Sequence, residues 1–205
     1  HELGHGLAGL ALARREAERA LLIILWAMGG LCVQGGRDGR PWKELIIVLA
    51  GPAVSLVLWL GCGLALTALA QHDITLVVQA GAEQTANGVL YGDWYYHVNP
   101  HDLTLGGLLL WMGWWLNFAL LLFNILPIYP LDGGQATYNL MKMVLRNYDL
   151  ARRISFAGSI GFAIWFVADR IAGDRGQIEG HTIWAGVVML YLLHNAYLSL
   201  FVYRR

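Results

Sequence analysis

The first five residues of the chain, His1-Glu2-Leu3-Gly4-His5, carry two imidazoles and a carboxylate in the pattern HExxH. Residues four apart in an α-helix lie on one face, one turn along, so both imidazoles can reach one zinc ion. Glu2 projects toward the same region, where a carboxylate can take a proton from water. A catalytic zinc also needs a third protein ligand and an open position. The spacing therefore predicts a zinc site that activates water and whose third ligand lies elsewhere.

The residues after this motif are apolar, with the sequence LAGLALA over residues 7–13. In a water-soluble chain, HExxH could simply mark a surface helix with solvated His and Glu side chains. In a membrane-spanning stretch each ionisable group costs several kcal/mol, on the order of 3, and such groups are usually functional. The apolar setting therefore favours the metal site over the solvated helix.

Asp132 is the candidate for the third ligand. Most other acidic residues lie in loops or at the ends of apolar stretches, whereas Asp132 belongs to the segment 124–134, NILPIYPLDGG. Pro127 and Pro130 each lack a backbone donor and break a helix, so the segment unwinds and can direct a carboxylate into protein. A helix over 134–148 with Asp132 as its N-cap is the alternative, and capping and ligation are compatible roles.

Composition places these residues in a membrane protein. The 205 residues are 57% hydrophobic and 14% charged, with a mean hydropathy of +0.50 and nine tryptophans and nine tyrosines. Amphipathic rings of this kind gather at membrane–water interfaces. The formal net charge of zero gives no general attraction to nucleic acid, so no nucleic-acid partner is predicted. Cys32 and Cys62 show no CxxC spacing, and we interpret them as small buried apolar residues.

The apolar stretches predict an all-α polytopic fold with about five transmembrane helices. A spanning helix needs about 20 apolar residues. His1–Ala13 is shorter and is interpreted as the second half of a span whose beginning lies upstream. Residues 20–34 are also too short, and their glycines favour a re-entrant or interfacial strand hairpin that protein must cover. The four full-length stretches are approximately 45–70, 105–126, 154–172 and 181–203.

The distribution of basic residues predicts the orientation. If the segment after the first helix is cytoplasmic and the spans alternate, twelve of the fourteen basic residues fall on the cytoplasmic side. This bias is the positive-inside pattern and places the carboxyl terminus inside. His5 precedes Arg14 by nine residues, about 14 Å along a helix. We therefore expect the metal site within a multi-pass cell-membrane protein, toward its cytoplasmic side.

HExxH followed at a distance by NxxPxxPLDGG resembles the site-2 protease family of intramembrane zinc metalloproteases (peptidase M50-like). The second motif matches at Asn124, Pro127, Pro130 and the run 131–134, and the resemblance covers approximately residues 1–150. Ala50-Gly51-Pro52 is a further similarity, although Ser55 stands where the family often has Asn. The segment at Gly29-Gly30 is similar to the membrane-embedded strands of that family.

The resemblance implies an endopeptidase with one Zn²⁺ per chain that cuts transmembrane segments within the bilayer. It implies His1, His5 and Asp132 as metal ligands and Glu2 as the catalytic base. It also suggests that the Asn124 amide binds the substrate backbone or the oxyanion; a buried amide bonded between helices is the alternative. The expected substrate is a single-span membrane protein, whose unwound segment the 20–34 hairpin could hold by strand addition.

The same resemblance divides the chain into a metalloprotease core over residues 1–150 and two additional C-terminal transmembrane helices over 151–205. The oligomeric state stays open, as do the identity of the substrate and any regulatory partner.

Two other functions stay open at this point. The first is a membrane zinc or divalent-metal transporter of the ZIP type, which also places HExxH-like sequences in a span. His194 in the last span would suit a transporter, but we expect a buried, hydrogen-bonded histidine there. The second is a catalytically silent relative that binds membrane proteins without cutting them.

Overall fold

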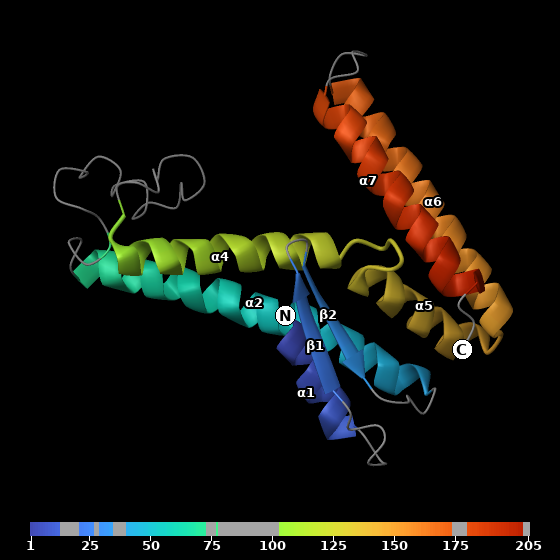
Figure 1. The fold of residues 1–205 in the computed structure, drawn as a ribbon, viewed down its shortest axis with the longest axis horizontal. Coiled ribbons are helices and arrows are strands. Elements are labelled where there is room, and N and C mark those ends of the chain that lie inside the picture. The colour runs from blue at the N-terminus through green and yellow to red at the C-terminus, as the bar shows by residue number, and fades with distance from the viewer. Residues whose placement is uncertain are drawn as a thin grey trace. The chain divides into compact units, whose positions relative to one another are not determined.

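The computed structural model describes residues 1–12, 21–26, 29–34, 40–72, 77, 103–173 and 180–202 (Figure 1). The chain divides into two compact units: the first unit is His1–Pro52 with Leu122–Arg205, and the second unit is Ala53–Leu121. In chain order the elements are α1 Glu2–Leu12, β1 Leu21–Trp26, β2 Gly29–Gln34, α2 Pro41–His72, α4 Leu105–Asn124, α5 Asp132–Leu145, α6 Tyr148–Gly173, α7 Gly180–Tyr197 and a π-helical turn Leu198–Val202.

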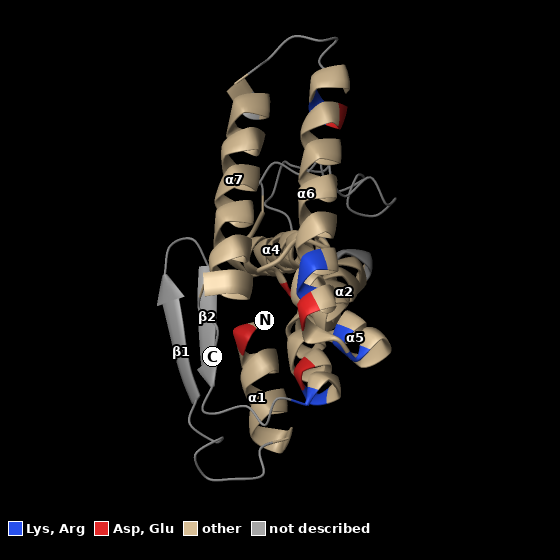
Figure 2. Cartoon of the chain, turned by 90° about the vertical axis from the view of Figure 1, so that its right-hand side faces the viewer, with Lys and Arg blue, Asp and Glu red and all other residues tan. Residues whose placement is uncertain are grey.

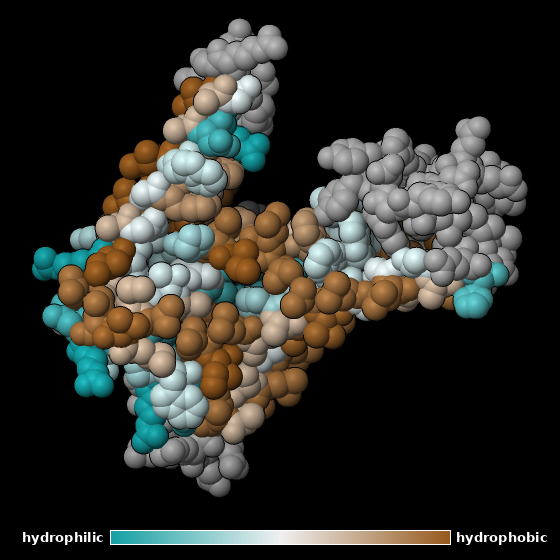
Figure 3. All heavy atoms as spheres, turned by 180° about the vertical axis from the view of Figure 1, so that it is seen from behind, coloured by the Kyte–Doolittle hydropathy of each residue, from teal (hydrophilic) through white to brown (hydrophobic). Residues whose placement is uncertain are grey.

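Four described helical stretches are long and apolar enough to cross a membrane, and they coincide with the four full-length predicted spans. Large apolar side chains stand exposed on them, for example Leu64 at 71% and Leu190 at 69%. Figure 3 shows how much of one face is apolar. An exposed apolar surface of this extent needs lipid or protein to cover it. The predicted class, a mainly helical polytopic membrane protein, is confirmed. The four stretches are Pro41–Leu69, Leu105–Asn124, Tyr148–Gly173 and Thr182–Val202.

The two strands lie within the segment predicted as a hairpin. β1 pairs with β2 in an antiparallel register that runs from Leu21 opposite Gln34 to Trp26 opposite Gly29. Both strands run close to α1. The strands therefore stand beside the helix that carries HExxH, while their depth in a membrane stays a prediction.

The ends of three helices differ from the predicted ends, because hydropathy marks the apolar part of a helix and not its caps. α2 begins at Pro41, a favourable first helical residue. α6 begins at Tyr148 and not at 154, since the Asn147 Oδ1 accepts hydrogen bonds from the Asp149 and Leu150 N–H groups. α5 ends at Leu145, and Arg146 closes it in the left-handed conformation (φ 52°).

In the first unit α6 packs against both α5 and α7. Its buried face carries a small residue at every fourth position: Ala151, Ser155, Ser159 and Ala163. Small residues let neighbouring helices approach closely inside a membrane. The core here is formed by Ile128, Ala163, Met189 and Leu192. Ile128, fully buried, belongs to the loop before α5, so this loop rests on α6.

The second unit consists of α2 from Ala53 onward and α4 up to Leu121, with an apolar core of its own formed by Leu66, Val77, Leu103 and Trp114. Stacked rings of Trp114, Trp115 and Phe118 run along α4. Ser55 of this unit is fully buried. A role for it beyond packing stays a prediction.

Candidate metal centre

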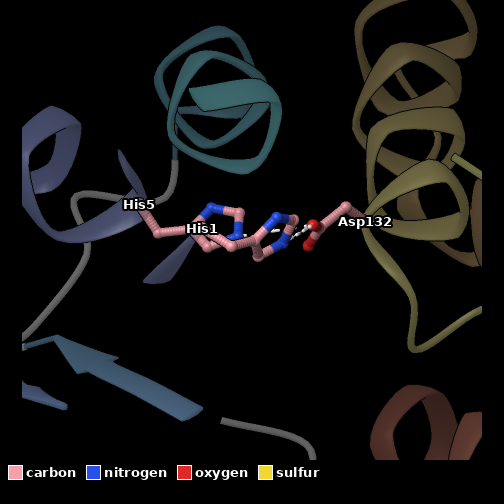
Figure 4. Close-up of side chains that lie close together, drawn as sticks. All are labelled: His1, His5 and Asp132. Atoms are coloured by element: carbon pink, nitrogen blue, oxygen red, sulfur yellow. Dashed lines mark hydrogen bonds and ion pairs between the residues drawn. The ribbon is translucent and has the colours of Figure 1, made fainter. Parts of the chain in front are cut away.

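The structure brings His1, His5 and Asp132 together, as Figure 4 shows. One ligand atom from each lies within 4.8 Å of the other two. The Asp132 Oδ2 lies 2.9 Å from the His1 Nε2 and 3.3 Å from the His5 Nε2. The two imidazoles meet edge to face, with ring centroids 5.0 Å apart. Residues 131 positions apart thus present two nitrogens and one oxygen to a common point.

Asp132 is the first residue of α5, and Leu131 occupies the N-cap position without a side-chain cap hydrogen bond. The alternative prediction of Asp132 as the N-cap of a helix over 134–148 is therefore wrong. The helix starts two residues earlier than predicted because Gly133 and Gly134 let its first turn lie directly against the backbone of the preceding loop. A helix amino terminus favours a negative charge. Asp132 is only 7% exposed, and its carboxylate points toward the imidazoles and not back onto its own helix.

The loop before α5 is held by close backbone contacts and by α6. A Cβ at Gly133 would lie 2.2 Å from the Ile125 carbonyl oxygen, and one at Gly134 would lie 2.2 Å from the Tyr129 nitrogen. Only glycine permits this approach. The Tyr129 N–H donates to the Ser159 hydroxyl at 3.1 Å, and this hydroxyl donates to the Ser155 carbonyl. The Tyr129–Pro130 peptide bond is cis.

His5 is oriented by α2. Its Nδ1 donates a hydrogen bond to the Ile47 carbonyl oxygen at 2.8 Å. A proton on Nδ1 leaves the Nε2 lone pair of the neutral ring directed toward Asp132. Gly51 makes room for the ring, because a Cβ there would lie 2.2 Å from the His5 Nε2. Sequence reasoning missed both roles, although the Ala50-Gly51-Pro52 motif was a signal for the second.

The donor set fits a zinc ion. Two imidazole nitrogens and a carboxylate oxygen are common ligands of catalytic zinc, which leaves a further position for water. The His5 Nε2 and the Asp132 Oδ2 face each other at 3.3 Å, and two lone pairs at that distance repel unless a proton or a metal cation lies between them. The hydrogen bond from the His5 Nδ1 to a backbone carbonyl is the outer-shell partner that a metal-binding histidine usually has.

The other predicted residues lie outside this cluster of three. Glu2 is half-buried at the start of α1, next to His1 in the chain. Asn124 is half-buried at the last position of α4, where the helix gives way to the loop of Asp132. Their catalytic roles stay predictions. His194 on α7 was expected to be buried, but it is exposed on the surface of this chain. It lies on the face of α7 that is turned away from the protein core.

Two imidazoles and a carboxylate placed to hold one metal ion, in a chain with four described helices long and apolar enough to cross a membrane, are typical of membrane metalloproteins. Comparison with known proteins narrows this class. The sequence model of peptidase family M50 matches residues 1–168, so the chain belongs to that family. It is 30% identical over 96% of its length to the Synechocystis protein named "Putative zinc metalloprotease sll0528". It is 35% identical over 65% of its length to the Mycobacterium tuberculosis protein named "Putative zinc metalloprotease Rip3".

The chain spans 42% of the Synechocystis protein and 27% of the mycobacterial one, so it covers less than half of these curated relatives. No solved structure matches it. The resemblance to intramembrane zinc metalloproteases that the two motifs indicated is confirmed by the family match.

Proposed function

We propose that this chain is the catalytic part of a zinc-dependent endopeptidase of the site-2 protease type, which hydrolyses peptide bonds of transmembrane segments within the bilayer. The convergence of His1, His5 and Asp132 on one point carries the proposal. These three residues would hold one zinc ion. A transporter would need a path lined by further ligands, and the described residues contain no second cluster of this kind.

Glu2 acts as the general base and acid in this proposal. Zinc, when bound, supplies the Lewis acidity that lowers the pKa of water toward about 7 and polarises a carbonyl. The Glu2 carboxylate takes the proton of the attacking water and later delivers it to the leaving amine. The Asn124 side-chain amide donates to the substrate backbone or to the oxyanion, since it lies where α4 opens into the loop of Asp132.

The substrate must be locally extended, because a helix shields its own carbonyl groups in hydrogen bonds to the residue four positions on. A single-span membrane protein that unwinds near the metal site meets this condition. The edge of the β1–β2 pair, which runs close to α1, would hold the extended segment by strand addition. Proline substitutions along that edge that leave cleavage intact would count against this part of the proposal.

The membrane orientation is also part of the proposal. Four basic residues of the segment between α4 and the apolar part of α6, namely Lys142, Arg146, Arg152 and Arg153, would lie on the cytoplasmic side. The carboxyl terminus would lie on the same side in a cell membrane, and the metal site would open toward the cytoplasm.

Glu2→Gln tests the function directly. The variant should keep its zinc, because the three ligands remain, and lose cleavage by about 10²-fold or more, because the proton acceptor is lost. Membranes of cells with the variant should accumulate uncut single-span proteins relative to the parent, as measured by quantitative proteomics, and metal analysis should find zinc in both purified proteins. Asp132→Asn is the contrast, since it should lose zinc and cleavage together.

An unchanged membrane proteome in both variants, together with altered zinc uptake into vesicles, would establish the transporter instead. The silent binder would be indicated if the parent protein binds zinc and cells with the parent and with Glu2→Gln contain the same amounts of every uncut membrane protein, with zinc uptake unchanged.

A further inference from the structure

Two adjacent charged residues in the first turn of α2 contact different helices of the first unit. Lys43 is 5% exposed, and its Nζ donates to the Leu12 carbonyl oxygen at 2.8 Å. Leu12 ends α1, the helix that begins with His1-Glu2. Lys43 thus places a cation at the carboxyl end of α1, where the unpaired carbonyl groups of a helix favour positive charge.

Glu44 makes the second contact. Its Oε2 lies 3.0 Å from the Lys142 Nζ, and the two side chains are 18% and 10% exposed. Lys142 stands in the last turn of α5, the helix that begins with Asp132. The Lys142 Nζ also lies over the Tyr138 ring, 4.6 Å from its centroid. Burial of the pair away from water strengthens the attraction relative to an exposed ion pair.

The metal ligands lie at the opposite ends of the same two helices. Leu12 follows His5 by seven residues, about 10 Å along α1, and Lys142 follows Asp132 by ten residues, about 15 Å along α5. Each ligand helix is therefore attached to the first turn of α2 at its far end. A third attachment, from the His5 Nδ1 to the Ile47 carbonyl oxygen, joins α2 to α1 one turn further along.

Close backbone packing contributes little to the connection between α2 and the two ligand helices. In the part of the chain that the structure describes, α1 runs closest to the two strands and α5 to α6, and close backbone contacts of α2 with either ligand helix are sparse. Side-chain contacts of Lys43, Glu44 and His5 therefore carry much of the connection. We propose that Lys43 and Glu44 form a charge clamp that fixes α1 and α5 relative to each other, and that they are positioning residues for the proposed metal site.

General rules for charged residues do not explain the pair. Glu44 by itself would be explained by the preference of helix amino termini for acids. The same preference disfavours Lys43 at that place. The positive-inside bias would explain a lysine near the cytoplasmic interface, but it does not explain why Lys43 is buried against the end of α1. Figure 2 shows charged residues gathered at the ends of α2 and α5 in this unit. Lys43 and Lys142 are also the two lysines of this chain, whose other twelve cations are arginines.

The positioning role of the clamp rests on the proposed function, because it presupposes the zinc site. The clamp can be tested by measuring zinc affinity, without a cleavage assay. The full protein, purified in detergent and stripped of metal, is titrated with Zn²⁺ against a competing chelator. Glu44→Gln and Lys142→Gln should each weaken zinc binding roughly three- to tenfold, below the roughly 10- to 100-fold loss typical of direct outer-shell partners. The double variant should lose no more than either single one, because the two residues act through one contact.

Lys142→Arg should retain most of the affinity, since an arginine can still pair with Glu44. Lys43→Met should weaken zinc binding by a similar factor, because it removes the contact of the clamp with the Leu12 carbonyl at the end of α1. Asp149→Asn is the matched control, because it removes an ion pair with Arg152 that lies within α6 and joins no ligand helix. Lys142 should also react faster with an amine-acylating reagent in Glu44→Gln than in the parent, as mass spectrometry of the peptide that contains Lys142 would show.

Unchanged zinc affinity in Glu44→Gln and Lys142→Gln would overturn the clamp, and so would losses that add in the double variant. Asp132→Asn separates this failure from failure of the proposed function. If Asp132→Asn loses zinc while the clamp variants keep it, the metal site stands without the clamp. If the parent itself binds no zinc, the proposed function fails first.

Discussion

At the residue scale, one hydrogen bond and one missing methyl group define the direction of the His5 imidazole. The Nδ1 contact to the Ile47 carbonyl oxygen fixes the tautomer, and Gly51 leaves the space in which the ring lies. Both supports come from α2, one helical turn apart. The second ligand of the proposed site therefore depends on a backbone atom and on the absence of a side chain.

Gly51→Ala should displace His5. The added methyl would lie 2.2 Å from Nε2 and 2.4 Å from Cε1, and a ring held from its other side cannot move without losing its hydrogen bond. We expect at least about tenfold weaker zinc binding, measured by chelator competition. Gly61→Ala in the same helix is the control, since nothing lies within 4 Å of its new Cβ and alanine favours a helix. Equal zinc affinity in the two variants would contradict this reading of Gly51.

The three metal-ligand candidates could be predicted from the sequence, but their supports could not. HExxH defines its own geometry, because helical spacing alone brings His1 and His5 to one face. Asp132 was conspicuous as a carboxylate in a proline-broken apolar stretch. Ile47 contributes only its backbone carbonyl, which every residue has, so no residue type could indicate it. Gly51 stood in a visible motif, yet its purpose depends on which ring lies opposite.

At the element scale, the loop over residues 125–131 is held from two directions. Gly133 and Gly134 let the first turn of α5 press against the loop backbone. On the other side, the Ser159 hydroxyl of α6 accepts the Tyr129 N–H. The helix start at Asp132 is therefore a property of the loop and of α6 together.

Ser159→Ala should destabilise the protein, because it leaves the Tyr129 N–H without this acceptor in a buried place. The expected loss is about 1–3 kcal/mol in the free energy of unfolding, with weaker zinc binding as a consequence. Ser155→Ala is the matched control one turn away. Its hydroxyl is buried but has no hydrogen-bond partner among the described residues, so its removal should cost much less. Denaturant unfolding in detergent compares the two, and equal losses would refute the role of Ser159.

The spans could be predicted because lipid exposure leaves long apolar runs in the sequence. The helix ends were less predictable, since caps such as Asn147 and Arg146 act through local backbone geometry. The start of α5 at Asp132 needed the contact between Gly134 and the Tyr129 nitrogen. That contact joins residues close in sequence. The bend of the loop that makes it possible depends on packing against α6, and a hydropathy pattern carries no information about such packing.

At the scale of the whole molecule, orientation in the membrane can be measured on a single helix. α6 extends from Tyr148 to Gly173, about 38 Å, longer than the hydrocarbon thickness of about 30 Å. With Cys32 and Cys62 replaced by serine, Gly173→Cys should react with a membrane-impermeant maleimide in intact cells. Tyr148→Cys should react only after the membrane is opened. The reverse order would turn the proposed metal site toward the outside.

The bond between Tyr129 and Ser159 also limits how the metal site can be transplanted. The three candidate ligands end at position 132, and a shortened donor segment ending at 150 would contain all of them. It would not contain Ser159, nor Ala163, against which Ile128 of the loop packs. A graft of the proposed centre onto another scaffold would therefore have to include α6 together with His1, His5 and Asp132.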